Sequence, residues 1–388
     1  MDFSFSPEQE RLRDEVSEFL NNELRAGSFK PICDPFMHGF SREFSRKVGQ
    51  KGWIGMTWPK EVGGQAKSYT ERNIVIEELM RCGAPIAAHY LGDRQIGPSL
   101  IAFGSDALKE EFIPRIISGE IVFTVCISEP EAGSDLASLK TRAIEENGHF
   151  VIDGQKLWAS HAHLCDYCYV VARTDPNVAK HKGISEFIVD VKLPGISIRP
   201  IADMSGHSDL CEVFFDSVKI PSRYLVGQKN RGWHQILSQL DYERGNIDRL
   251  MANYPLFKFI LNYVKDQESK IPTDEFLLVR DRLAQLQIEF EIGRLLVYRA
   301  VWMLDQGQLP TCEAAMSKLF CTQFEKRLDN TIMQILGPYG QLVGDSKYTP
   351  ADGMAATSYL FSPCRTIQGG TTEALKNIMA IRGLGLPR

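Results

Sequence analysis

Apolar residues recur with the spacing of an α-helix over the first third of the chain. Residues 6–9 form a capping box with Ser6 as the N-cap, and the apolar positions that follow share one helical face: Leu12, Val16, Phe19 and Leu20. Further helices are expected at 41–50, 69–82 and 100–117. The helical period returns after residue 232, in long apolar stripes at 276–297 and 314–336 that are typical of a helical bundle.

The pattern between these two regions is different. Short β-branched and aromatic runs alternate with turn residues such as Asn147-Gly148 and Asp153-Gly154. The expected strands are 122–127, 150–152, 169–172, 187–189, 196–198 and 213–215. The sequence therefore predicts an α+β fold in three parts: an N-terminal all-α domain (1–120), a middle β-barrel or sandwich domain (121–230) and a C-terminal four-helix bundle (231–388).

Composition and charge narrow the function classes. The net charge of −5 and the absence of long Lys/Arg blocks argue against nucleic-acid binding. No apolar run approaches the roughly 18–20 residues that span a bilayer, and no secretory signal is visible at the start. Nine scattered cysteines suit reduced thiols, so we expect a cytoplasmic location, with the mature form of an organelle protein as the alternative.

Four segments carry recognisable motifs. Residues 52–59 read G-W-I-G-M-T-W-P, 128–135 read S-E-P-E-A-G-S-D, 156–160 read K-L-W-A-S and 334–337 read Q-I-L-G. In this order and at these intervals they resemble motifs of the acyl-CoA dehydrogenase family, and the resemblance runs from about residue 5 to 386. It implies FAD as cofactor, an acyl-CoA thioester as substrate and the same α, β, α order of domains.

The resemblance assigns the flavin contacts to the two motifs of the β domain. Ile127 and Ser128 would contact the pyrimidine edge, and Ser134 the pyrophosphate, on a loop that turns at Gly133. A plain Gly-Ser turn is the alternative for this loop. Trp158 would lie flat beside the isoalloxazine with the Ser160 hydroxyl directed at N5, while simple packing in the β core is the alternative for Trp158.

A neighbouring subunit holds the ADP part of FAD in this family. Gln334 and Gly337 match its Q-x-L-G motif, and the resemblance assigns Thr371 and Glu373 to cofactor contact as well. The family's R-x-x-F-G segment has no counterpart here, because residues 266–270 read D-Q-E-S-K. A Lys does not replace a bidentate Arg, so a partner chain would have to supply it.

The catalytic base is expected in an unusual place. The family's usual Glu lies in an E-G-T segment, but Gly369 occupies that position here. A second arrangement in the family has the base in an L-x-x-E-R segment of the first bundle helix, which Glu243 and Arg244 match. Glu243 would then take the α-proton, while the backbone N–H of Gly369 would still donate to the thioester oxygen. The alternative for Glu243 is a surface carboxylate paired along its helix.

The lost side chain at Gly369 opens space beside the acyl chain. We therefore expect a bulky, branched or cyclic acyl group, and by resemblance an electron-transfer flavoprotein as acceptor. The expected assembly is a homodimer or homotetramer, or a heterotetramer with a related subunit.

Other interpretations stay open. The chain is alternatively the base-bearing subunit of a heteromeric dehydrogenase, a flavin monooxygenase on the same fold or a non-catalytic acyl-CoA-binding subunit. The stretch His161 to Cys168 looks like a metal site, but structural zinc generally takes its ligand pairs from separated segments, so no metal is expected. Residues 383–386 are too short for a phosphate loop.

Overall fold

The chain begins with a run of helices in the computed structural model, which describes residues 3–237, 247–270, 272–344 and 346–387. The Ser6 hydroxyl accepts the backbone N–H of Gln9, whose side chain accepts the backbone N–H of Ser6, so the predicted capping box is confirmed. The helices of this region are α1 (Pro7–Arg25), α2 (Arg42–Gln50), α3 (Tyr69–Arg81), α4 (Ala87–Leu91), α5 (Gly97–Phe103) and α6 (Asp106–Ile117). A π-helical segment, Gly92–Ile96, joins α4 to α5.

The described strands of the middle region form one sheet. They are β1 (Phe123–Cys126), β2 (Arg142–Glu146), β3 (His149–Ser160), β4 (Tyr167–Arg173), β5 (Ile184–Asp190), β6 (Ile196–Ile201), β7 (Leu210–Pro221) and β8 (Leu225–Val226). Their order is β6-β7-β3-β2-β4-β5-β8, and β1 pairs with β4 in parallel. Buried apolar side chains of this sheet, such as Phe150, Phe187 and Val213, form a core of their own.

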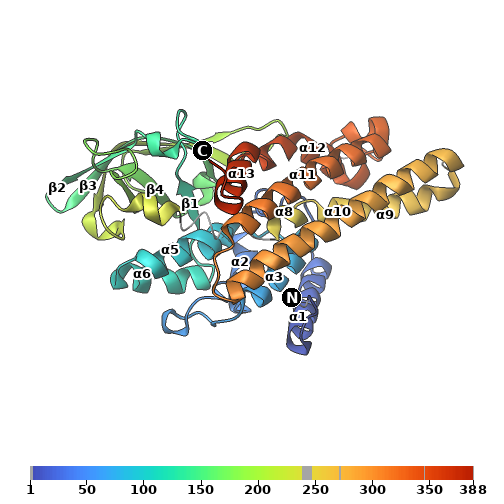
Figure 1. The fold of residues 1–388 in the computed structure, drawn as a ribbon, viewed down its shortest axis with the longest axis horizontal. Helices are drawn as coiled ribbons and strands as arrows, with labels where there is room; N and C mark the ends of the chain where they lie inside the picture. Colours follow the sequence, from blue (N-terminus) through green and yellow to red (C-terminus); the bar gives the residue numbers. More distant parts are fainter. Residues whose placement is uncertain (1–2, 238–246, 271, 345, 388) are drawn as a thin grey trace.

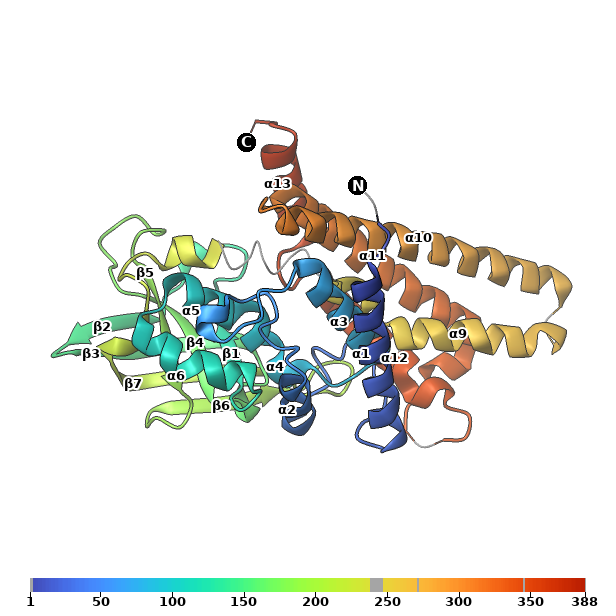
Figure 2. The ribbon, with the colours of Figure 1, turned by 90° about the horizontal axis from the view of Figure 1, so that it is seen from below.

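The last region is again helical. Its helices are α8 (Asp248–Met251), α9 (Tyr254–Gln267), α10 (Thr273–Asp305), α11 (Thr311–Leu336), α12 (Met354–Arg365) and α13 (Thr372–Ile378). Figures 1 and 2 show the sheet at one end of the molecule and the paired α9 and α10 extending away from it at the other. The predicted α+β fold, with helical regions before and after a β region, is confirmed.

One continuous core joins the two helical regions. It runs from Val16 and Leu79 of the N-terminal helices to Leu250, Phe257 and Phe324 of the bundle, all of them buried. The two helical regions therefore share one hydrophobic core and do not pack as separate units.

Candidate functional site

The two predicted flavin motifs lie side by side. The backbone N–H of Leu157 on β3 donates to the carbonyl oxygen of Ser128 at 2.9 Å. The Lys156 ammonium, which is fully buried, donates to the carbonyl oxygen of Ile127 and to a Glu129 carboxylate oxygen, both at 2.9 Å. The loop after β1 is thus fastened to the strand that carries Trp158.

The Glu129–Lys156 pair is the electrostatic anchor of this arrangement. Glu129 also accepts the backbone N–H groups of Lys140 at 2.6 Å and Thr141 at 2.9 Å. Burial raises the pKa of Glu129, but the Lys156 charge and these hydrogen bonds outweigh burial and leave its pKa below the ordinary value. Burial lowers the pKa of Lys156, and Glu129 offsets part of that effect. Neither residue was assigned a role from its motif, although both belong to the motifs that resemble the flavin site.

Further along the loop, the predicted phosphate contacts face outward. Gly133 and Ser134 are exposed, and a Cβ added at Gly133 would meet no atom within 4 Å. The turn before them is closed by two backbone hydrogen bonds of 3.1 Å between Glu129 and Ala132. This geometry leaves room for an anion at the loop.

Trp158 lies where β3 departs from regular pairing. The register with β7 shifts between Lys156 and Ala159, and Trp158 has a φ of 64° with 54% of its surface exposed. A bulky residue with positive φ is an outlier, and bulges commonly redirect a side chain at a functional site. Ser160, half-buried, ends the strand two residues later.

A cavity of about 220 Å³ lies between the N-terminal helices and the end of α10. The π-helical segment Gly92–Ile96 contributes Asp93, Arg94 and Gln95 to its wall, and Ser99 of α5 follows one turn on. The remaining lining is largely apolar and includes Trp58, Pro98, Ile101, Ala102, Phe103 and Leu304. π-Bulges inside helices are frequent at functional sites.

Predicted Glu243 and Arg244 lie outside the described residues, but the chain on either side of them is fixed at this cavity. Before them, Gln235 donates to Glu186 at 2.5 Å, and Glu186 accepts the hydroxyl of Tyr169 at 2.7 Å. Tyr169 in turn bonds Ser99 at 2.7 Å. All four residues are buried.

After them, Asp248 accepts Arg94 at 2.8 Å and the hydroxyl of Tyr90 at 2.6 Å. Asp248 and Arg94 are also buried. Both flanks of residues 238–246 are therefore tied to α5 or to the π-helical segment before it.

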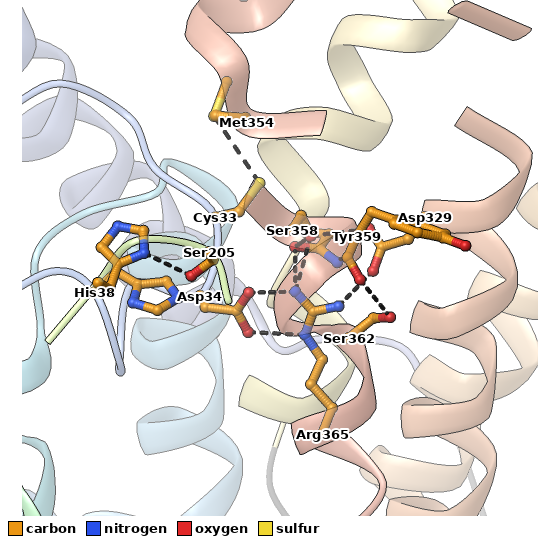
Figure 3. Close-up of polar contacts among 12 residues, drawn as sticks. Cys33, Asp34, His38, Ser205, Asp329, Met354, Ser358, Tyr359, Ser362 and Arg365 are labelled. Atoms are coloured by element: carbon orange, nitrogen blue, oxygen red, sulfur yellow. Dashed lines mark hydrogen bonds and ion pairs between the residues drawn. The ribbon is translucent and has the colours of Figure 1, made fainter. Parts of the chain in front are cut away.

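The segment with Gly369 follows directly after a buried ionic cluster. Arg365, the last residue of α12, donates to the carboxylates of Asp34 and Asp329 and to the Ser358 hydroxyl. Figure 3 shows the guanidinium enclosed by these three residues. The N-terminal region is thereby fastened to the bundle at the point where the Gly369 segment begins.

Within that segment the backbone is strongly bent. Gly369 and Gly370 have φ values of 67° and 111°, and the buried Lys318 ammonium donates to the Gly370 carbonyl at 2.6 Å. Thr371 is the N-cap of α13 and accepts the backbone N–H of Ala374, while Glu373 lies in the first turn. Glycine suits both positive-φ positions.

Comparisons with known proteins identify the family. Residues 6–120, 124–218 and 230–384 match the N-terminal, middle and C-terminal domains of acyl-CoA dehydrogenase. The chain is 32% identical to the acyl-CoA dehydrogenase FadE29 of Mycobacterium tuberculosis, over 100% of this chain and 99% of that protein. The chain belongs to the acyl-CoA dehydrogenase family.

Solved structures agree with this assignment. A steroid acyl-CoA dehydrogenase, Tcur3481-Tcur3483, is similar at a TM-score of 0.91 with 31% identity, and the match covers 100% of both chains. The ChsE4-ChsE5 complex from M. tuberculosis is similar at a TM-score of 0.87 with 30% identity over 100% of both chains. The suspected family is confirmed, and the chain is an FAD-dependent oxidoreductase.

The residues present fit the flavin. The exposed Trp158 indole offers a flat aromatic face, and the Leu157–Ser128 hydrogen bond brings the pyrimidine-edge loop to the same strand. Ile127, Ser128, Trp158 and Ser160 would hold the ring system, with Gly133 and Ser134 at the phosphates. These individual contacts stay predictions.

The predicted ADP contacts of this acyl-CoA dehydrogenase lie on the bundle. Gln334 is exposed near the end of α11 and accepts Arg282 at 2.9 Å, and Gly337 follows that helix with a φ of 56°. The segment lacking the family's Arg corresponds to the end of α9 and the 3-10 turn Glu268–Lys270.

Two negative observations concern the described residues alone. No group of three or more His, Cys, Asp or Glu side chains in that part of the chain is arranged to hold a metal ion. No described helix is both long and apolar enough to cross a membrane.

Proposed function

We propose that this acyl-CoA dehydrogenase removes hydrogen from Cα and Cβ of a bulky, branched or cyclic acyl-CoA, with Glu243 as the base. The family name alone does not define the acyl group or the base. Similarity to a protein named a steroid acyl-CoA dehydrogenase supports the bulky acyl group. The place of Glu243 between two anchored flanks supports its role.

That anchoring is the observation on which the proposal depends. Buried hydrogen bonds connect Gln235, through Glu186 and Tyr169, to Ser99 in the wall of the cavity. Asp248 is bonded directly to Arg94 in the same wall. Glu243 is eight residues after Gln235 and five before Asp248. Burial against the apolar part of the wall would make a carboxylate a stronger base than in water, because burial disfavours its charge, whereas Arg72 and Arg94 in the same wall act in the opposite direction.

The chain's own groups divide the remaining work. Arg244 would orient the neighbouring carboxylate, and the backbone N–H of Gly369 would donate to the thioester oxygen as charge develops there. One such donor is typically worth about 3–4 kcal/mol. FAD, when bound, supplies the hydride acceptor. An electron-transfer flavoprotein is the proposed partner for reoxidation.

Gly369 also supports the choice of substrate. Any residue with a side chain at this position would have to adopt a positive φ, which glycine tolerates best. The missing side chain leaves space beside the acyl chain. The buried Lys318 ammonium donates to the Gly370 carbonyl and helps to fix this bent backbone.

A heteromeric enzyme is the second candidate, and one observation favours it. Residues 266–270 contain no Arg and no Phe-Gly pair, so a phosphate contact of FAD would have to come from another chain. One similar solved structure is the ChsE4-ChsE5 complex from M. tuberculosis, whose name joins two different proteins. In this version the chain is the base-bearing subunit.

The test is an anaerobic screen of acyl-CoAs for bleaching of the visible flavin band. We expect bleaching by branched or cyclic acyl-CoAs, and Glu243→Gln to slow it at least about 100-fold, the usual contribution of a general base. Glu110→Gln, an exposed carboxylate on α6, is the matched control and should bleach at the parent rate. Unchanged bleaching by Glu243→Gln would exclude Glu243 as the base.

A further inference from the structure

The turn that follows β3 is held by the N-terminal region. His38 Nδ1 lies 2.7 Å from Asp209 Oδ2, and the other carboxylate oxygen of Asp209 lies 3.5 Å from Nδ1 of His161. His161 directly follows Ser160, the last residue of β3. One carboxylate therefore connects residues 38 and 161, which belong to different regions of the fold.

The backbone at this point is strained and buried. His161 has a φ of 53°, its side chain packs 5.1 Å from Phe40 between ring centroids, and only 3% of its surface is exposed. Its N–H donates to the carbonyl of Asp209 at 2.6 Å, one step beyond the Ser160–Leu210 pair of β3 and β7. A non-glycine residue keeps such a φ only where its surroundings enforce it.

Several charged and titratable groups face Asp209. The His38 and His207 rings stack with centroids 3.9 Å apart, and Ser205 bonds His207 at 2.9 Å. Figure 3 shows Ser205 and His38 close together. Burial raises the pKa of Asp209, but the hydrogen bond from His38 and the neighbouring imidazoles lower it below the ordinary value. Asp209 is thus an anion at neutral pH, suited to hold His38. Burial lowers the pKa of His161, whose ring lies against Asp209 at 3.5 Å without a hydrogen bond.

We propose that Asp209 is a positioning residue for the flavin-facing end of β3. Its carbonyl accepts the His161 N–H, and its carboxylate, held by His38, lies beside the His161 ring, so Asp209 sets the direction of the Ser160 hydroxyl one residue earlier. The proposal rests on the proposed function, in which that hydroxyl is directed at the flavin.

A second contact from the same N-terminal stretch acts further along the turn. Arg42 donates to Asp166 at 2.8 Å and to the carbonyl of Leu164 at 2.7 Å. Its side chain is 32% exposed, and salt screens such pairs far more than buried ones. The residues that Arg42 contacts, Leu164 and Asp166, lie four and six positions after Ser160, whereas Asp209 bonds the residue next to Ser160, so Asp209 has the more direct influence.

The experiment compares the FAD-loaded holoenzyme with its Ser160→Ala, Asp209→Asn and Asp216→Asn variants. Asp216 is an exposed carboxylate on β7, the strand that begins one residue after Asp209, and serves as the control. The readouts are the visible flavin spectrum and the midpoint potential in a dithionite titration. We expect both to move in Asp209→Asn in the same direction as in Ser160→Ala, with the FAD dissociation constant within about threefold of the parent.

The outcomes separate this inference from the function on which it rests. If Ser160→Ala changes neither readout, the proposed flavin contact fails and the positioning role fails with it. If Ser160→Ala changes both and Asp209→Asn neither, only the positioning role fails, whatever happens to the melting temperature. Where Asp209→Asn yields little folded protein, His38→Asn removes the same hydrogen bond from the other side and must shift the spectrum in the same direction.

Discussion

Trp158 illustrates what a motif conveys about a single residue and what it leaves out. Its place in K-L-W-A-S predicted a flavin contact, and the alternative was simple packing in the β core. The indole is more than half exposed, which disfavours that alternative. Its positive φ and the register shift of β3 were beyond prediction, because they depend on pairing with β7 about 55 residues later.

Glu129 and Lys156 show a related limit. Both were visible in the motifs, but their ion pair joins residues 27 positions apart, and the sequence does not say that they meet. Glu243 and Arg244 stay predictions, since they fall outside the described residues.

His89 provides a prediction at the scale of one residue. It is buried on α4, bonds Ser45 at 2.8 Å, and burial lowers its pKa to about 4, with Asp93 and Arg72 making smaller opposed contributions. The unfolded chain has a His pKa of about 6.5, so below that pH His89 binds a proton in the unfolded chain but not in the folded one. Stability should therefore fall between pH 6.5 and pH 4, by as much as about 3 kcal/mol in total from this group.

His89→Asn keeps a short polar group for Ser45 and cannot titrate. Urea midpoints measured at pH 7, 6 and 5 should decline less steeply in this variant than in the parent. His161 and His207, whose pKa values burial also lowers, retain their share of the slope in both proteins. If the urea midpoints of the variant and the parent declined equally with pH, His89 would have the same pKa in the folded and unfolded chains.

The sequence predicted helices with one apolar face well. It predicted strands poorly where pairing with a distant strand sets their length. The stripes of α10 and α11 and the cap of α1 follow from local sequence and are confirmed. The expected helix at 100–117 is two helices, because Gly104 and Ser105 end α5 and cap α6. β2 was missed, since four of its five residues are exposed and it reads R-A-I-E-E. β3 is far longer than the expected 150–152, because polar residues along it pair with β7.

The Glu129–Lys156 ion pair joins the loop after β1 to β3, and its contribution to stability can be measured. Lys156→Met would leave the Glu129 carboxylate buried without its cation, and breaking a buried pair in this way costs about 3–5 kcal/mol. The double variant Glu129→Gln with Lys156→Met has no such charge and should be considerably more stable than the single one. Urea denaturation of the parent, both single variants and the double variant gives the coupling energy.

A coupling near zero would contradict the central place of this pair. It would mean that the backbone hydrogen bonds of Lys140 and Thr141 alone hold Glu129, and that the Leu157–Ser128 hydrogen bond suffices to join the loop after β1 to β3.

At the scale of the molecule, contacts between distant segments bring the three regions together. Asp34 pairs with Arg365, His38 with Asp209, and the backbone N–H groups of Tyr69 and Thr70 donate to Asp305 at 2.6 and 3.1 Å. Local patterns predicted the order α, β, α but none of these pairs, because each joins residues more than 170 positions apart. The predicted site was consequently a set of motifs, and the folded chain adds the anchors that align them.

The assembly of several chains is also expected to determine how FAD is held. The chain has the predicted ADP contacts Gln334 and Gly337 on the bundle but no Arg at 266–270, so under the proposed function a homo-oligomer would lack one bidentate phosphate contact at every site. Purified alone, the chain should carry well below one FAD per protomer, and co-expression with a family member that has an R-x-x-F-G segment should raise the content. Absorbance near 450 nm per protein, measured with light scattering on the same column peak, reports occupancy and stoichiometry together. A homo-oligomer with one FAD in every protomer would show that another group on this chain replaces the Arg, and would remove the main reason for a mixed assembly.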